Sequence, residues 1–332
     1  MKTRLLTLLF LTCAAALARA ADKPYGPKQF PDDTAYTAIV MAYEPEVRAV
    51  LEAIDKHSEA AIDKTLTYRG VKYRLGTYRG EPIVLFATGI SIANAAMTTQ
   101  MALDYFPVER LVFMGIAGGI NPQWQPGDVI VPERWYYHDE AVYANPDPDN
   151  PGAFILPDYY ENFLEGHAQR AEKDPHAPAY SNFGYVHPEE VLIIKDGMAE
   201  PEPAAYFSVT PDLLAIAKTA VEKMPPQSID ERAVQIHVGG NAVTGSVFLD
   251  NRAYRRWVRE VFKAEVTEME SAAVGQVCTI NETDWIVIRA VSDLAGGQEG
   301  KNDENIYDFP VSVIGAKVLF AILDELAEAD GD

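Results

Sequence analysis

The sequence predicts an α/β fold, because short buried strands alternate along the chain with amphipathic helices. The clearest strand is residues 285–291, where β-branched residues crowd a short apolar run, as they do in strands buried on both faces of a sheet. The clearest helix is residues 44–54, which has apolar residues at helical spacing and Pro45 in its first turn. With 332 residues, 48% of them hydrophobic, the chain can bury the core of one large domain.

The remaining elements follow the same two patterns. We expect further strands at residues 37–42, 71–78, 82–87, 111–114, 129–132 and 233–238. We expect further helices at residues 93–105, 211–224, 250–262 and 306–326, and one that opens at Glu268-Met269-Glu270. The alternating strands 71–78 and 82–87 are joined through Arg79-Gly80-Glu81, which indicates a hairpin.

The N-terminus has the pattern of a secretory signal peptide. Residues 1–20 contain Lys2 and Arg4, then an apolar run, then the small-x-small triplet Ala18-Arg19-Ala20. We therefore expect residues 1–20 to be removed, residues 21–36 to form a polar tether, residues 37–332 to form the domain, and the protein to be periplasmic or secreted. No later stretch reaches about 18 uninterrupted apolar residues, so we expect no membrane insertion. The mature chain would keep one cysteine, Cys278, which we expect to be a packed core residue.

The net charge excludes some classes of partner, and one long irregular stretch indicates an insertion. The formal net charge of −21 argues against nucleic acid and anionic membrane surfaces as partners, since both require clustered Lys and Arg. Residues 145–203 are rich in Pro, Asp and aromatic residues and have little periodicity. We interpret them as an insertion, either a functional loop or a covering excursion, rather than as a second domain.

Carboxylates at the ends of buried elements are the candidate functional residues. Glu268 and Glu270 stand at a predicted helix start, Asp293 follows the strand 285–291, and Glu46 lies in the first helical turn after the first strand. Ionised groups in such places are costly unless they are paired or used, although each alone could be an ordinary cap or turn residue. Ligands of open α/β sheets bind where strands hand over to loops and helices, so the position of Glu46 points to a pocket.

Five motifs carry a resemblance to a known family. They are E-M-E-S-A-A at residues 268–273, V-I-R-A-V-S-D at 287–293, A-Y-E-P-E-V at 42–47, T-G-I at 88–90 and M-G-I-A-G-G at 114–119. In this order they resemble the purine nucleoside phosphorylase and nucleosidase superfamily, closest to its methylthioadenosine/S-adenosylhomocysteine nucleosidase branch. The resemblance runs from about residue 37 to 326. It implies a single α/β domain with a mixed central β-sheet flanked by helices, a homodimer, and a purine nucleoside as the small-molecule partner.

The resemblance also implies roles for particular residues. Asp293 would protonate purine N7, and Glu46 would activate the attacking water. Glu270 and Met269 would hold the ribose 2′ and 3′ hydroxyls, and Arg289 with Ser292 would steady Asp293. Val243 would meet the base, and the other expected substrate-binding residues are Glu268, Ile90, Gly118 and Tyr43.

Two departures from the family pattern bear on the reaction. Phosphorylases of the superfamily hold phosphate with an Arg and a Ser where this chain has Phe113 and Ile116. This favours hydrolysis over phosphorolysis, although the hydrolase branch also usually keeps the Ser. A phosphorylase and a non-catalytic nucleoside-binding protein remain the alternatives. We expect no cofactor and no metal, because His138 and Asp139 are adjacent and lack a third ligand.

The 5′ side of the expected substrate also departs from the thioadenosine-cleaving relatives, which have an apolar pocket there. The matching positions in this chain are Tyr43 and Asn145. A hydroxyl and an amide facing the 5′ carbon would favour a substrate that can hydrogen-bond. We therefore expect a 5′-hydroxyl to be accepted at least as well as a methylthio group.

Overall fold

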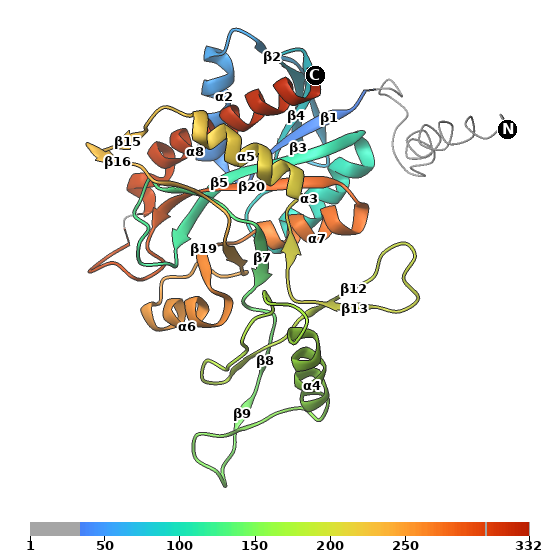
Figure 1. Ribbon diagram of the computed structural model, residues 1–332, viewed down its shortest axis with the longest axis vertical. Coiled ribbons are helices and arrows are strands. Elements are labelled where there is room, and N and C mark those ends of the chain that lie inside the picture. The colour runs from blue at the N-terminus through green and yellow to red at the C-terminus, as the bar shows by residue number, and fades with distance from the viewer. Residues whose placement is uncertain (1–33, 303, 332) are drawn as a thin grey trace, which may run out of the picture.

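The computed structural model describes residues 34–302 and 304–331 and confirms the predicted fold class (Figure 1). The expected signal peptide, residues 1–20, and all but the end of the expected tether lie outside the described residues. A mixed central sheet runs in the order β14-β7-β18-β19-β5-β1-β4-β3-β2, and β20, β6 and β17 attach to it. Helices pack against this sheet, as the sequence indicated.

The middle of the sheet consists of parallel strands. These are β1 (Tyr36–Met41), β4 (Glu81–Ala87), β5 (Val108–Gly119) and β20 (Asp284–Asp293). The strand β3 (Val71–Tyr78) forms the predicted hairpin with β4, and β2 (Ala60–Tyr68), which the sequence pattern did not indicate, adds an antiparallel edge. The other half of the sheet comprises β6 (Val129–Val131), β7 (Arg134–Tyr137), β14 (Phe207–Ser208), β17 (Ile236–Val238), β18 (Asn241–Thr244) and β19 (Ala264–Glu268).

The predicted helices are present, with small shifts of their ends. They are α2 (Glu44–Lys56), α3 (Ile92–Tyr105), α5 (Pro211–Lys223), α6 (Arg252–Phe262), α7 (Ser271–Asn281) and α8 (Glu304–Gly331). One predicted start was wrong: Glu268 does not open a helix but ends β19, and Glu270 is the N-cap of α7. The turn between β19 and α7 therefore contains only Met269 and Glu270, which places both beside the ends of the central strands.

The helix α8 packs against α2, α5, β5 and β20. Its segment Ile306–Ala329 is long and apolar enough to cross a membrane by length and composition, but half of the most apolar window is buried inside the fold. This is the pattern of a core helix, because its apolar face is covered by the sheet. Cys278, on α7, is buried in the same core, as predicted.

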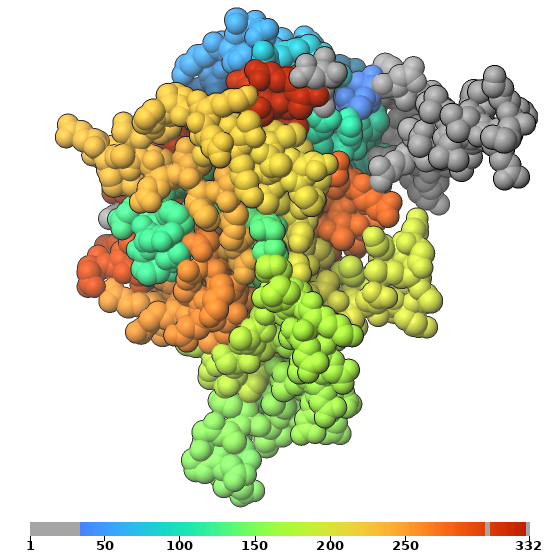
Figure 2. All heavy atoms as spheres, in the orientation of Figure 1, coloured from blue at the N-terminus to red at the C-terminus, as the bar shows by residue number. Residues whose placement is uncertain are grey.

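The insertion at residues 145–203 forms most of an arm that projects from the body (Figures 1 and 2). It contains α4 (Tyr159–Ala171) and the short pairs β9 (Asn145–Pro146) with β10 (Phe154–Ile155) and β12 (Val191–Ile193) with β13 (Glu202–Ala204). At its base β8 (Ala141–Tyr143) pairs with β11 (Val186–Pro188), and a separate two-stranded turn joins β15 (Ser228–Ile229) to β16 (Arg232–Ala233).

Buried polar contacts hold the arm together. His167 Nδ1 lies 2.6 Å from Glu190 Oε1, and Arg170 donates to the other oxygen of Glu190 at 2.5 Å. The ring of Tyr180 lies 4.4 Å from that of His167. The insertion is therefore held by interior contacts of its own and by contacts with the body, such as the bond that Trp257 Nε1 donates to the Ser181 carbonyl at 2.9 Å, although its sequence lacks strong periodicity.

Candidate active site

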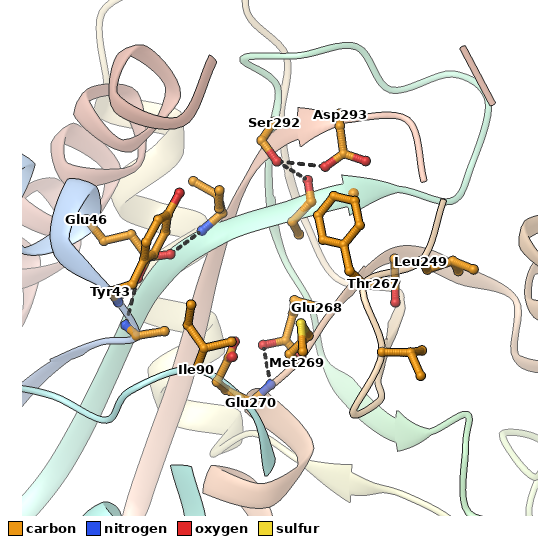
Figure 3. A pocket seen from close by; sticks show the side chains of 16 residues that line it. Tyr43, Glu46, Ile90, Leu249, Thr267, Glu268, Met269, Glu270, Ser292 and Asp293 are labelled. Carbon is orange, nitrogen blue, oxygen red and sulfur yellow. Dashed lines mark hydrogen bonds between the residues drawn. The ribbon is translucent and has the colours of Figure 1, made fainter. Parts of the chain in front are cut away.

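One pocket collects most of the candidate residues at the C-terminal ends of β1, β5, β19 and β20 (Figure 3). Its lining includes nine of the eleven residues singled out from the sequence: Tyr43, Glu46, Ile90, Gly118, Glu268, Met269, Glu270, Ser292 and Asp293. The other two, Val243 and Arg289, do not line it. The pocket is acidic, since four of its side chains are carboxyl groups and none is Lys, Arg or His.

Glu46 is held by backbone donors on both of its oxygens. Its Oε2 accepts from Ala42 N at 2.6 Å and from Tyr43 N at 3.2 Å, and its Oε1 accepts from Ile116 N at 2.9 Å. Burial raises the pKa of Glu46, and Arg289 and these three N–H groups oppose that rise. Because Oε1 accepts a single bond, it keeps a lone pair available to a bound water.

The contact between Glu46 and Ile116 bears on the serine that relatives have at this position and that this chain lacks. The Ile116 side chain offers no hydroxyl, but its backbone N–H fixes Glu46. The neighbouring Gly115 is required, because a Cβ there would collide with Arg289 Nη1 and lie 2.8 Å from Glu46 Oε1. The position that holds Arg in phosphorylases is Phe113, which is fully buried and has the Arg289 guanidinium carbon 4.3 Å from its ring centre.

Asp293 is a buried carboxyl group at the end of β20. Its Oδ1 accepts from Ala295 N at 2.8 Å and from Asn302 Nδ2 at 3.4 Å, and its Oδ2 lies 2.9 Å from Ser292 Oγ. Burial raises the pKa of Asp293, against the effect of these donors. Since the N–H donors occupy Oδ1, an acidic proton is best placed on Oδ2. Ser292 can accommodate it there by turning its hydroxyl to the Ala117 carbonyl, 3.3 Å away.

Arg289 lies behind the pocket and pairs with glutamates rather than with Asp293, which corrects the expectation from the sequence. Its guanidinium hydrogen-bonds Glu268 and donates to Ser271 Oγ at 2.7 Å. Glu268 is further held by Thr244 Oγ1 and by the backbone N–H groups of Glu270 and Ser271. The pair therefore fixes the turn that carries Met269 and Glu270.

Glu270 lies between Arg289 and the start of α3. Its Oε2 is 3.7 Å from Arg289 Nη2, and its Oε1 accepts from Ser91 N at 2.8 Å. Burial, and then the negative charge of Glu268, raise the pKa of Glu270 from 4.5 to about 8. One arginine thus faces two buried glutamates, and its guanidinium lies farther from Glu270 than from Glu268.

The raised pKa of Glu270 predicts that the folded protein loses stability as the pH rises. A carboxyl group whose pKa is raised in the folded state binds its proton more tightly there than in the unfolded chain. For Glu270 that stabilisation is complete below pH 4.5 and is lost as the pH approaches about 8. We expect the thermal midpoint to fall between about pH 5 and pH 8.5, and to fall less in Glu270→Gln. Equal slopes for the two proteins would contradict this assignment.

Another part of the pocket wall is formed by residues that the sequence analysis missed. Val243 is fully buried in β18 and belongs to the second core cluster, so it cannot meet a base there. The chain instead reaches the pocket a few residues later, at Val247, Phe248 and Leu249. An apolar triplet soon after Gly245, beyond the end of a strand, was the signal available in the sequence.

The expected 5′ side is only partly present. Tyr43 lines the pocket, but Asn145 lies exposed on β9 in the arm and is not part of the lining. Of these two residues, only Tyr43 lies where this chain could present a polar group to the 5′ substituent. The mouth of the pocket has exposed apolar side chains as well: Ile90 is 48%, Val247 45% and Phe248 56% exposed.

Among the described residues, no group of three or more His, Cys, Asp or Glu side chains could hold a metal ion. His138 is buried, and its Nδ1 lies 3.2 Å from the Tyr254 hydroxyl. Asp139 accepts from Ser246 N at 2.5 Å and so anchors the segment that leads to Val247. The two residues therefore support the wall of the pocket.

The fold and this site define the class of protein. The model of the phosphorylase superfamily matches residues 36–327, which is most of the chain. The chain therefore belongs to the phosphorylase superfamily, as the motifs indicated.

Relatives within the superfamily narrow the comparison. The chain is 28% identical over 239 residues to the 5′-methylthioadenosine/S-adenosylhomocysteine nucleosidase of Marinomonas sp., covering 72% of this chain and 79% of the relative. It is 25% identical over 289 residues to the nucleosidase of the same name from Tolumonas auensis, covering 87% and 98%. These relatives are N-glycosyl hydrolases by name.

Solved structures agree on the fold. The Helicobacter pylori 5′-methylthioadenosine/S-adenosylhomocysteine nucleosidase superimposes with a TM-score of 0.62 at 20% identity, covering 88% of this chain and 99% of that one. The futalosine hydrolase of the same organism gives a TM-score of 0.60 at 20% identity, covering 88% and 98%. At this identity the likeness describes the fold alone.

Proposed function

We propose that this protein is a nucleosidase that hydrolyses the N-glycosidic bond of a purine nucleoside to free base and ribose sugar. The observation that carries the proposal is the placement of Glu46 and Asp293, which enter one pocket from opposite sides with Glu270 and Met269 at its floor (Figure 3). A base and an acid on either side of a scissile bond are what glycoside hydrolysis requires.

The reaction follows from what each group can do. The bond between C1′ and N9 breaks with its electrons going to the base, and Asp293 delivers its proton to purine N7. Glu46 Oε1 takes a proton from the water that bonds to C1′. Glu270, next to Met269, hydrogen-bonds the sugar hydroxyls through its carboxyl group, which can accept from them and, while protonated, also donate to them. Val247, Phe248 and Leu249 provide the apolar surface on which a flat base can stack.

A non-catalytic binding protein on this fold is the alternative from another class. It would have no use for three carboxyl groups whose pKa values are raised inside one pocket. Incubating the protein with adenosine, inosine and methylthioadenosine, with chromatographic detection of free base, tests the proposal directly. Binding of nucleosides without release of base would favour the alternative.

A phosphorylase is the alternative within the superfamily. A phosphate dianion needs fixed positive donors, whereas the pocket lining has none and Phe113 fills the place of the phosphorylase arginine. We therefore expect that phosphate neither accelerates the release of base nor yields ribose 1-phosphate. Product analysis with and without phosphate measures this, and ribose 1-phosphate as the main product would assign the chain to the phosphorylases.

We also propose that the enzyme is exported and acts as a homodimer without inserting into the membrane. The signal-peptide pattern of residues 1–20 supports export to the periplasm or the medium. Exposed apolar side chains gather at the mouth of the pocket and on the arm, which includes Tyr143, Tyr185 and Leu192, and a second copy could cover them. Cell fractionation tests the first proposal, and sedimentation analysis of the mature protein tests the second.

A further inference from the structure

Ser91 has an unusual backbone conformation at the edge of the pocket. Its φ of 87° is the largest positive φ among the described non-glycine residues, and its ψ is 154°. This region of backbone space is suited to glycine and is strained for any residue with a Cβ. Strained residues that persist at a binding site are candidates for a functional role.

The backbone contacts of Ser91 do not explain why the residue is serine. Its N–H donates to Glu270 Oε1 at 2.8 Å, and its carbonyl accepts from Ala95 N at 2.9 Å. Glycine would make both contacts without strain, since both use only main-chain atoms. What serine adds at this position is therefore its hydroxyl group.

The hydroxyl lies at the rim of the pocket. Ser91 Oγ is 3.5 Å from Ser246 Oγ, and both groups are accessible to solvent. Each serine is next in sequence to a residue of the pocket lining, Ile90 in one case and Val247 in the other. The two hydroxyls thus form a polar link between two apolar walls of the mouth.

The end of the pocket where this link lies indicates what it can bind. Ile90 and Glu270 lie at the end away from Asp293 (Figure 3). In the proposed reaction Asp293 meets the base and Glu270 meets the 2′ and 3′ hydroxyls. The remaining exocyclic group of a nucleoside is its 5′ substituent.

We propose that Ser91 Oγ, supported by Ser246, hydrogen-bonds the 5′ substituent and so favours a 5′-hydroxyl over a thioether. A hydroxyl can donate to and accept from the serine pair, whereas a thioether sulfur is only a weak acceptor. This inference rests on the proposed nucleosidase function. It assigns specificity to a residue outside the group of carboxylates that carries the chemistry.

The test compares Ser91→Gly and Ser91→Ala with the wild type on adenosine and methylthioadenosine. In both variants we expect kcat/KM for adenosine to fall about 3- to 10-fold relative to that for methylthioadenosine, the size expected for one hydrogen bond. In Ser91→Gly alone we also expect a higher thermal midpoint, because the strain is relieved. Glu282→Gly, at a φ of 54° in the C-cap of α7, is the matched control and should leave the substrate ratio unchanged.

Each outcome is decisive. An unchanged ratio of the two substrates in both Ser91 variants would overturn the proposal. If the wild type releases no base from any nucleoside, the proposed function fails. The ratio of the two equilibrium dissociation constants, measured by calorimetry, would still test Ser91 in that case.

Discussion

Replacing Asp293 by asparagine is expected to lower kcat by about 10²- to 10⁴-fold while leaving nucleoside binding nearly intact. The amide can still hydrogen-bond the base, but it has no acidic proton to deliver to N7. In the wild type, burial at the end of β20 raises the pKa of Asp293, which keeps more of the carboxyl group protonated near neutral pH. Single-turnover release of base and calorimetric binding measure the two effects separately.

Asp250→Asn is the matched control for this variant. Asp250 accepts from Gln298 and Asn302 in the loop that follows Asp293, yet it is exposed and does not line the pocket. It should retain turnover within a few-fold of the wild type, since it removes a nearby acid without removing the proton donor. Wild-type turnover in Asp293→Asn would refute the assignment of the general acid.

The elements of the central sheet were predictable because each buried strand carries its own signal. The strand at residues 285–291 and the helix at 44–54 have dense, unbroken patterns, and both are present as β20 and α2. By contrast, β2 has mostly exposed side chains and polar residues, so no periodicity marked it as a strand. It is formed by pairing with β3, which is a contact that the sequence does not display.

The site was predictable where a motif and an element end coincide, and unpredictable where a side chain turns away. Glu46, Glu270 and Asp293 all reach the pocket from the ends of elements. Arg289 lies on the same strand as Asp293, but it sits further back along β20, behind the pocket, where Glu268 binds it. Val243 was misplaced for a similar reason, because β18 continues past it before the chain turns into the pocket at Val247.

Replacing Glu46 by glutamine is expected to lower kcat/KM by about 10²- to 10⁴-fold through loss of the base that activates water. The three backbone N–H groups around this side chain all require acceptors, and two of them converge on Oε2. They hold the carboxylate in one orientation, with Oε1 beside Gly115 and facing the pocket. An amide in the same place cannot remove a proton from water.

The same contacts require a control for folding, because the amide nitrogen that Glu46→Gln introduces would face at least one backbone N–H without an acceptor. Glu46→Ala removes that conflict, and we expect an equal loss of activity from it if the base is what matters. Glu44→Gln, on the same first turn but exposed and outside the pocket, should retain wild-type kinetics. Since Glu46 must be ionised to act, the acidic limb of the wild-type pH profile should lie above the ordinary range of a glutamate, in the direction in which burial raises its pKa. A Glu46→Ala variant that is folded, binds nucleoside and turns it over at the wild-type rate would show that water is activated elsewhere.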